Sequence, residues 1–217
     1  MDETGDLVYR YTHLASALDI LLRRRLTLMS PARWSDQNDV AFIKAYKAAA
    51  RKRTVRALCF TGVRDLSLHW NEFAPGTDGV RLEIVAADVR AEASRHPGVK
   101  FDRVDYRTIR EIQQLEIRTD RLPFTKRIPY QGEQELRLIY SSDQEMSDPF
   151  ELPLHPTSIK HIVLGPRTHE ALVAALQQVI HGIEGCAHIQ VYKTTLQLNK
   201  KWVQAVAAHG QAGSSDT

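Results

Sequence analysis

Two glutamates separated by one residue, Glu133 and Glu135, are the best candidates in this chain for acid–base or charge-stabilising chemistry. They follow a turn at Gln131-Gly132 and begin an apolar run that reads as a β-strand. Strand side chains alternate between faces, so both carboxylates are expected on one face and the leucines that follow on the other. Adjacent carboxylates repel each other unless a positive or polar group uses them. The pair therefore indicates a site, and a solvated strand face is the ordinary alternative.

An arginine inside an apolar strand is the second candidate. Arg10 lies between Tyr9 and Tyr11 in a short β-prone run. A guanidinium in such a strand either reaches solvent along its aliphatic stem or pairs with an anionic group inside. Arg10 is therefore a candidate anion-binding residue, and an ion pair with Asp19 or another acid is the alternative.

A hydroxyl group at the end of a strand is the third candidate. The run 55–61 ends at Thr61, directly before Gly62, so the Thr61 hydroxyl could bind a ligand or simply a neighbouring strand. Two cations, Lys126 and Arg137, flank the glutamates. Arg137 shares the expected face of the glutamates, so both cations are expected to neutralise part of the negative charge.

The composition is that of an ordinary globular protein. The chain has 217 residues, of which 43% are hydrophobic and 25% charged, enough for one domain with a real core. A net charge of +3 is too small to indicate nucleic-acid binding by itself, and the short apolar runs predict no membrane-spanning segment. Cys59 and Cys186 read as buried thiols and no signal peptide is recognisable, so a cytoplasmic location is expected. The histidines show no zinc-type spacing with a cysteine, so no metal is predicted.

Strands and helices are mixed without a regular βαβ rhythm, which predicts an α+β fold. The hydrophobic pattern predicts strands at 7–11, 26–30, 55–61, 80–85, 99–106, 133–140, 159–165 and 189–192. It predicts helices at 12–24, 40–52, 86–95, 108–120 and 168–182, and a short helix or turn at 66–73. Residues 141–156 are expected to form an exposed loop. No linker divides the chain, so 1–208 is expected to be a single domain and 209–217 a disordered tail.

The three candidates occur in an order that resembles ADP-ribosyltransferases of the arginine–serine–glutamate type, such as the cholera- and pertussis-toxin catalytic subunits. Those proteins begin with a Tyr-Arg strand, like Tyr9-Arg10, and carry a Glu-x-Glu strand later, like Glu133-Gln134-Glu135. Their middle strand reads Ser-Thr-Ser, whereas this chain has a single hydroxyl there, Thr61. The scaffold role of that strand is therefore the point at which the chain departs from the family.

A second resemblance covers nearly the whole chain. Bacterial proteins grouped as a domain of unknown function share a series of short motifs with it, in the same order. The matching segments are Tyr9-Arg10-Tyr11, Trp34 to Asp39, Cys59-Phe60-Thr61, Trp70 with Gly79, Lys126 with Tyr130, Glu133, Glu135 and Arg137, and Ile162 to Pro166. This resemblance implies an ADP-ribosyltransferase-like fold, with split antiparallel or mixed β-sheets, flanking helices and an NAD cleft.

The resemblance also implies a chemistry. Cleavage of NAD at the nicotinamide–ribose bond passes through an oxocarbenium-like centre, which a carboxylate stabilises. Glu135 is expected in that catalytic role, and Glu133 is expected to orient or deprotonate the acceptor. Arg10 suits a phosphate or ribose of NAD, and Thr61 would brace the nicotinamide end or Glu135. Tyr9 is also expected to bind NAD. Tyr130, Trp70 and Phe73 are candidates for stacking on the nicotinamide ring, and packing in the core is the alternative for each of them.

The expected function is that of an NAD-dependent ADP-ribosyltransferase, a toxin or phage-defence effector that modifies a protein or nucleic acid and has an antitoxin as a candidate partner. An NAD glycohydrolase, with the same site and water as acceptor, is the first alternative. A non-catalytic module that keeps the fold and binds a partner through the basic residues 23–25 and 51–53 is the second. No membrane partner is expected.

Overall fold

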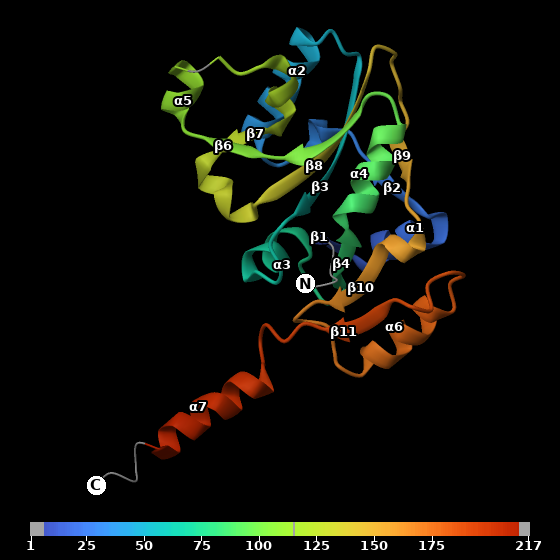
Figure 1. Cartoon of the computed structure of the whole chain (residues 1–217), viewed down its shortest axis with the longest axis vertical. Helices are drawn as coiled ribbons and strands as arrows, with labels where there is room; N and C mark the ends of the chain where they lie inside the picture. Colours follow the sequence, from blue (N-terminus) through green and yellow to red (C-terminus); the bar gives the residue numbers. More distant parts are fainter. Residues whose placement is uncertain (1–6, 115, 213–217) are drawn as a thin grey trace.

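A seven-stranded sheet forms the centre of the protein (Figure 1). The structure is a computed structural model that describes residues 7–114 and 116–212. The strand order is β11 (Gln190–Lys193), β10 (Ile159–Leu164), β4 (Gly79–Val85), β1 (Leu7–His13), β3 (Thr54–Thr61), β8 (Glu135–Ser142) and β5 (Val99–Arg103). Strands β10 and β11 are parallel and the other pairs are antiparallel. The predicted α+β class with a mixed sheet is confirmed.

The sheet is split between β1 and β3. Strand β1 pairs with β4 along its whole length, and β3 does the same with β8. Strands β1 and β3 share a single paired position, where Tyr9 lies opposite Thr61. The two halves of the sheet therefore separate beyond this position, and the next stretch of β3 is left without β1 as a neighbour.

Most apolar side chains of the sheet gather on one face. Helices α1 (Leu14–Arg23), α4 (Ala86–Arg95) and α6 (Leu172–His181) pack on this side, and a two-stranded sheet of β2 (Arg25–Leu28) and β9 (Phe150–Pro153) extends it. Burying one such leucine or isoleucine contributes roughly 1.5–3 kcal/mol, so this face supplies most of the hydrophobic stabilisation. The largest contributors from the strands are Leu26, Leu28, Leu58, Phe60, Leu82, Ile84, Leu136, Leu138 and Ile162.

The opposite face of the sheet carries polar side chains. Because strand residues alternate, Tyr9, Thr61 and Glu135 point away from the apolar face. Helices α2 (Gln37–Ala49) and α3 (Ser67–Phe73) lie on this side. A short parallel pair, β6 (Asp105–Arg107) and β7 (Thr125–Arg127), and helix α5 (Ile109–Gln114) complete it. The 3₁₀ helices are η1 (Pro31–Arg33), η2 (Thr119–Phe124), η3 (Ile128–Glu133) and η4 (Pro156–Ser158).

Some element boundaries expected from the sequence are wrong. The expected helix 108–120 is only α5, which Thr108 and Glu111 cap reciprocally, followed later by η2. The expected loop 141–156 contains β9, because Phe150 stacks on Tyr140 and the segment pairs with β2. Thr12 belongs to β1, so the expected helix 12–24 begins only at Leu14, and the expected strand 99–106 divides into β5 and β6.

The last described helix, α7 (Lys200–Ala212), extends away from the sheet and its covering helices (Figure 1). Residues 209–212 are helical, which corrects that part of the expected tail, and 213–217 lie outside the described residues. In the part of the chain that the structure describes, no helix combines the length and apolar character needed to cross a membrane.

Candidate active site

The two glutamates meet at a lysine, although they do not share a strand. Strand β8 begins at Glu135, whereas Glu133 ends the 3₁₀ helix η3. Gln134 between them has a left-handed backbone, with φ of 42°, which breaks the alternation that the sequence suggested. The turn nevertheless brings the carboxylates together: Lys126 Nζ lies 2.6 Å from Glu133 Oε2 and 3.2 Å from Glu135 Oε2. The expected pairing occurs through a turn, and the expectation of a common strand face is wrong.

Five buried charged residues surround this point and are called here the Glu135 cluster: Asp39, Lys126, Glu133, Glu135 and Arg137. Arg137 Nε and Nη2 donate to the two carboxylate oxygens of Glu135, at 2.8 and 2.9 Å. Arg137 Nη2 also contacts Asp39 Oδ2, at 2.7 Å. Three carboxylates thus share two cations, and Asp39 Oδ1 has no hydrogen-bond partner among the described residues.

The carboxylates of the cluster differ in their pKa values. Burial alone raises the pKa of Glu135, but the Arg137 guanidinium and the Lys126 ammonium outweigh it and lower the pKa to about 2. Burial raises the pKa of Glu133 above its ordinary value, and the Lys126 ammonium only partly opposes this. Burial likewise raises the pKa of Asp39 against the attraction of Arg137 and Lys126. Glu135 is therefore a fixed anion, whereas Glu133 and Asp39 take up a proton more readily.

Arg10 lies at the split in the sheet. Its Nη1 donates to the Cys59 carbonyl oxygen of β3, at 2.8 Å. No ion pair joins Arg10 to any carboxylate that the structure describes, so the alternative of a pair with Asp19 is not what the fold contains. Burial lowers the pKa of Arg10, but an arginine starts high enough to remain a cation. Arg10 is thus a partly buried positive charge available to an anionic ligand.

A pocket of about 490 Å³ connects Arg10 with the glutamates. This volume is within the usual range for small-molecule sites. Of the residues singled out from the sequence, the lining includes Tyr9, Arg10, Thr61, Glu133 and Glu135. The rest of the wall comes from β1, β3, β7, α2 and α3 and from the segments on either side of η1; its members include Tyr11, Met29, Trp34, Asp36, Asp39, Cys59, Phe60, Glu72, Phe73 and Lys126.

Thr61 holds the turn that carries Glu133. Its Oγ1 donates to the Glu133 carbonyl oxygen at 2.6 Å and accepts from the Val63 amide at 3.1 Å. The Gly62 amide donates to the Gln134 carbonyl oxygen, at 3.0 Å. One hydroxyl and one amide therefore fix the irregular backbone at the end of η3. Both come from the end of β3, where this chain has the single hydroxyl of Thr61.

Two of the aromatics expected to stack on a ligand do not line this pocket. Trp70 is only 2% exposed, packs edge-on against Tyr11, and donates from Nε1 to Asp65. Tyr130 lies with its ring 4.8 Å from Lys126 Nζ. Trp70 belongs to the core because α3 turns Phe73, rather than Trp70, toward the pocket.

Three further residues belong to the site although the sequence gives them little local signal. Asp39 supplies the third carboxylate, and Trp34 lies 5.1 Å from the Arg137 guanidinium while also lining the pocket. Tyr106 accepts a hydrogen bond from the Glu135 amide, at 2.8 Å, and burial raises its pKa to about 12. The Asn-Asp motif at the start of α2 was the available signal for Asp39, whereas Tyr106 depends on the β6–β7 pairing and has no local signal.

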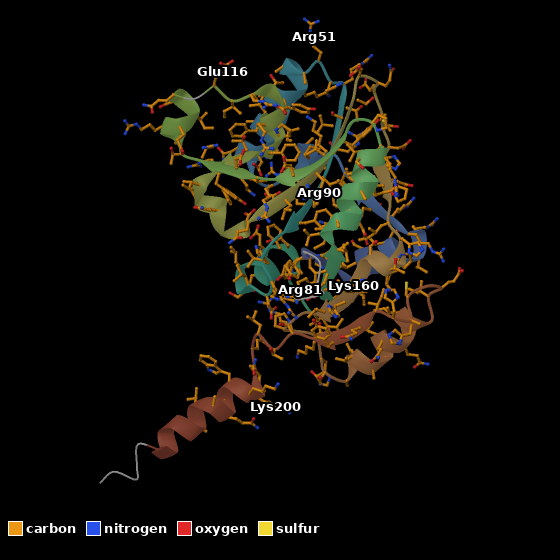
Figure 2. All side chains as sticks on the ribbon, viewed as in Figure 1. Arg51, Arg81, Arg90, Glu116, Lys160 and Lys200 are labelled. Atoms are coloured by element: carbon orange, nitrogen blue, oxygen red, sulfur yellow. The ribbon has the colours of Figure 1, made fainter. Side chains whose placement is uncertain are left out.

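A second buried ion cluster lies further along the polar face, at β4, and is called here the Arg81 cluster: Asp65, Arg81, Glu83 and His161. Arg81, labelled in Figure 2, contacts Glu83 Oε1 at 2.6 Å and Asp65 Oδ1 at 3.0 Å. His161 Nδ1 lies 2.8 Å from Glu83 Oε2. Thr194 Oγ1 donates to Asp65, at 2.8 Å. This cluster fixes the loop between β3 and α3, and its Arg81 guanidinium lies over the rings of Tyr9 and Tyr11.

The carboxylates of the site are already engaged by cations. Among the residues that the structure describes, no group of three or more histidine, cysteine, aspartate or glutamate side chains is arranged to hold a metal ion. The geometry of the site suits stabilisation of a positive charge by Glu135, binding of an anion by Arg10, and proton transfer by Glu133.

Comparison with known proteins gives structural neighbours and no sequence relatives. No protein-family model matches the chain, and no curated protein matches it. The structure is similar to DarT of Thermus sp. 2.9 in complex with NAD⁺, with a TM-score of 0.44 and 14% identity over 88% of this chain and 96% of that one. It is also similar to the same protein in complex with ADP-ribosylated single-stranded DNA, with a TM-score of 0.45 and 16% identity over 93% of this chain and 99% of that one.

Proposed function

We propose that this protein binds NAD in the pocket between Arg10 and Glu135, cleaves the nicotinamide–ribose bond, and transfers ADP-ribose to a macromolecular acceptor. The observation that carries the proposal is the pairing of opposite charges in one cavity. Glu135 is a buried anion, and Arg10 is a cation without a carboxylate partner among the described residues. NAD presents a ribose that becomes positive during cleavage and a pyrophosphate that is negative throughout.

The bond-breaking step follows from the position of Glu135. The electron pair of the ribose C1′–N bond leaves with nicotinamide, which becomes a neutral pyridine, and positive charge develops on the ribose. A preorganised anion in a water-poor site stabilises that charge more strongly than water does. Arg137 and Lys126 hold the Glu135 carboxylate in place and keep it ionised, so no reorganisation is required at the moment of reaction.

The transfer step needs a base. The acceptor nucleophile attacks C1′ and loses a proton, and Glu133, one of the two pocket carboxylates with a raised pKa, suits a group that takes up that proton. Arg10 binds the pyrophosphate with its planar fork. Phe73, which is 41% exposed at the pocket wall, is the best placed aromatic to pack on the nicotinamide ring, with Trp34 and Tyr9 on other parts of the wall.

The motif resemblance supports the same conclusion. Arg10, Thr61, Glu133 and Glu135, which carry the likeness to ADP-ribosyltransferases in the sequence, all line one pocket. An ADP-ribosyltransferase-like activity directed at a protein or nucleic acid in the cytoplasm, as a toxin or phage-defence effector, is part of this proposal. A toxin of this kind would arrest growth when expressed alone, and Glu135→Gln would relieve the arrest.

The direct test is incubation with NAD labelled in its adenosine part, followed by measurement of free nicotinamide and of label on protein and on nucleic acid. The proposal expects nicotinamide release and label transfer by the wild-type protein, and loss of both in Glu135→Gln. Glu145→Gln, at an exposed glutamate, is the matched control. Release without any transfer would instead indicate an NAD glycohydrolase. Absence of both release and NAD binding by calorimetry would overturn the proposal.

A further inference from the structure

A second groove lies on the other side of Lys126 from the proposed NAD pocket. It has a volume of about 480 Å³ and is formed by α2, α5 and the segments around β7. Lys126 lines both the groove and the pocket. A molecule bound in the groove would therefore lie beside the Glu135 cluster without entering it.

Two helix stripes face each other across this groove. On α2 the stripe is Asn38, Ala41, Phe42 and Ala45, whose spacing of three, one and three residues places them on one helix face. On α5 the stripe is Ile109, Ile112 and Gln113, and Leu122 contributes from η2. Ile109 is 63% exposed. The bed of the groove is thus largely apolar and open to solvent.

Helix α2 has a separate inner face that already satisfies its packing. Ile43 and Tyr46 are buried against Val55 and Ile139 of the sheet. A surface helix ordinarily needs only one apolar stripe, and the side facing water is polar. The second apolar stripe, with the half-buried Phe42, lies outside this inner face, and an apolar stripe that stays open to solvent is typical of a surface that binds a partner.

The charges around the groove have one sign. Arg107, Lys126 and Arg127 line it, and no acidic residue of the described chain does. Arg107 has a long contact with Glu111, at 3.7 Å, and Lys126 is held by the Glu135 cluster. Arg127 is exposed and forms no ion pair with any described side chain. The complement of this groove is an apolar surface with negative charge at its edge.

We propose that this groove binds an acidic segment of a partner protein that presents aliphatic side chains. An amphipathic segment would place leucine or isoleucine between the two stripes and its carboxylates against Arg107 and Arg127. Single-stranded nucleic acid fits less well because base stacking uses exposed aromatic faces, and Phe42 is the one aromatic in the lining. The exposed helix α7 of a second copy fits less well because Lys200 and Lys201 lie beside its Trp202.

The probe is a fluorescent synthetic peptide of leucine and glutamate with amphipathic helical spacing, and binding is measured by anisotropy on the full chain. The proposal expects saturable binding that weakens about tenfold or more in Arg127→Glu and in Ala45→Glu, because each places a negative charge in the groove. Two exposed positions outside the lining give matched controls: Arg110→Glu on α5 and Ala175→Glu on α6 should bind as the wild type does.

Each other outcome contradicts the groove proposal. No binding of the peptide, or equal weakening in the control variants, overturns it, as does equal binding of a peptide with lysine in place of glutamate. Tighter binding of a single-stranded oligonucleotide that Arg127→Glu abolishes would assign the groove to nucleic acid instead. The proposal does not depend on NAD chemistry: nicotinamide release, measured without peptide, should remain at the wild-type level in Arg127→Glu and Ala45→Glu. If the wild-type protein released no nicotinamide, that result would count only against the proposed function.

Discussion

The Glu135 cluster and the Arg81 cluster are built from the same unit and differ in how that unit is completed. Each contains an arginine and a glutamate two residues apart on one strand, Glu135 with Arg137 on β8 and Arg81 with Glu83 on β4. In both pairs the side chains point to the polar face of the sheet and are almost fully buried. The sequence pattern alone therefore does not distinguish a site from a structural ion pair.

The difference lies in the charge balance and in the neighbouring space. In the Arg81 cluster, the remaining atoms of Glu83 and Asp65 are taken by His161, Thr194 and the exposed Arg64. In the Glu135 cluster three carboxylates share two cations and a cavity adjoins. A buried atom without a described partner occurs in both clusters, Asp39 Oδ1 in the first and Arg81 Nε in the second. A surplus of buried negative charge beside a cavity is costly for folding, which indicates use by a ligand rather than a role in stability.

The comparison predicts that Arg81→Met mainly costs stability. The change leaves the buried Glu83, and the partly exposed Asp65, without their main cation, and breaking a buried pair in this way destabilises a protein by about 3–5 kcal/mol. Urea unfolding followed by circular dichroism measures the loss. Replacing both partners, as Arg81→Met with Glu83→Met, should recover part of it, because two apolar side chains leave no charge of this pair buried. A loss in Arg81→Met below about 1 kcal/mol would mean that the two clusters do not differ as argued.

Glu135→Gln is predicted to cost activity instead. The amide keeps the size of the side chain but removes the anion opposite the developing ribose charge, so nicotinamide release should fall about 100- to 1,000-fold. Arg137 retains Asp39 as a partner, so the folded state should persist in circular dichroism spectra. Glu83→Gln is the matched control, since it makes the same change in the Arg81 cluster. If it reduced nicotinamide release as strongly as Glu135→Gln does, the assignment of roles to the two clusters would be wrong.

Arg10→Met tests the positive end of the pocket. An arginine that binds an anion contributes about 1.5–3 kcal/mol, so NAD affinity measured by calorimetry should weaken about 10- to 100-fold. The stability of the fold should change little in comparison with Arg81→Met, because no described carboxylate depends on Arg10. Arg51→Met, at an exposed arginine outside the pocket lining, is the control. Unchanged NAD affinity in Arg10→Met would remove Arg10 from the binding site.

The sequence was sufficient for the α+β class and for the candidates that line the pocket, and insufficient wherever long-range contacts decide the structure. Arg10 and Glu135 could be found because a charge in an apolar strand is a local signal. The left-handed Gln134 could not, since Thr61 and Gly62 hold that turn from another strand. The sequence could not decide whether Trp70 lies in the pocket or in the core, because a position within a short helix or turn does not show on which side the ring packs; the structure buries it against Tyr11.

Glu133→Gln gives the smallest expected effect and separates the two glutamates. The pKa of Glu133 is raised in the fold, so its base form is lost as pH falls through a value above that of an ordinary glutamate. The protonated form accordingly favours the folded state at low pH, and that contribution is lost as pH rises. Label transfer by the wild type should therefore decline on the acid side at a higher pH than expected for an unperturbed glutamate.

In Glu133→Gln this acid limb should disappear, while nicotinamide release without acceptor should stay within about tenfold of the wild type because bond cleavage needs no base. Rates of release and of transfer measured across the same pH series give both quantities. Glu135, with a pKa of about 2, stays ionised over that whole series and cannot produce the limb. An acid limb that survives Glu133→Gln would move the base role to Asp39, whose pKa is raised by the same burial and which lines the same pocket.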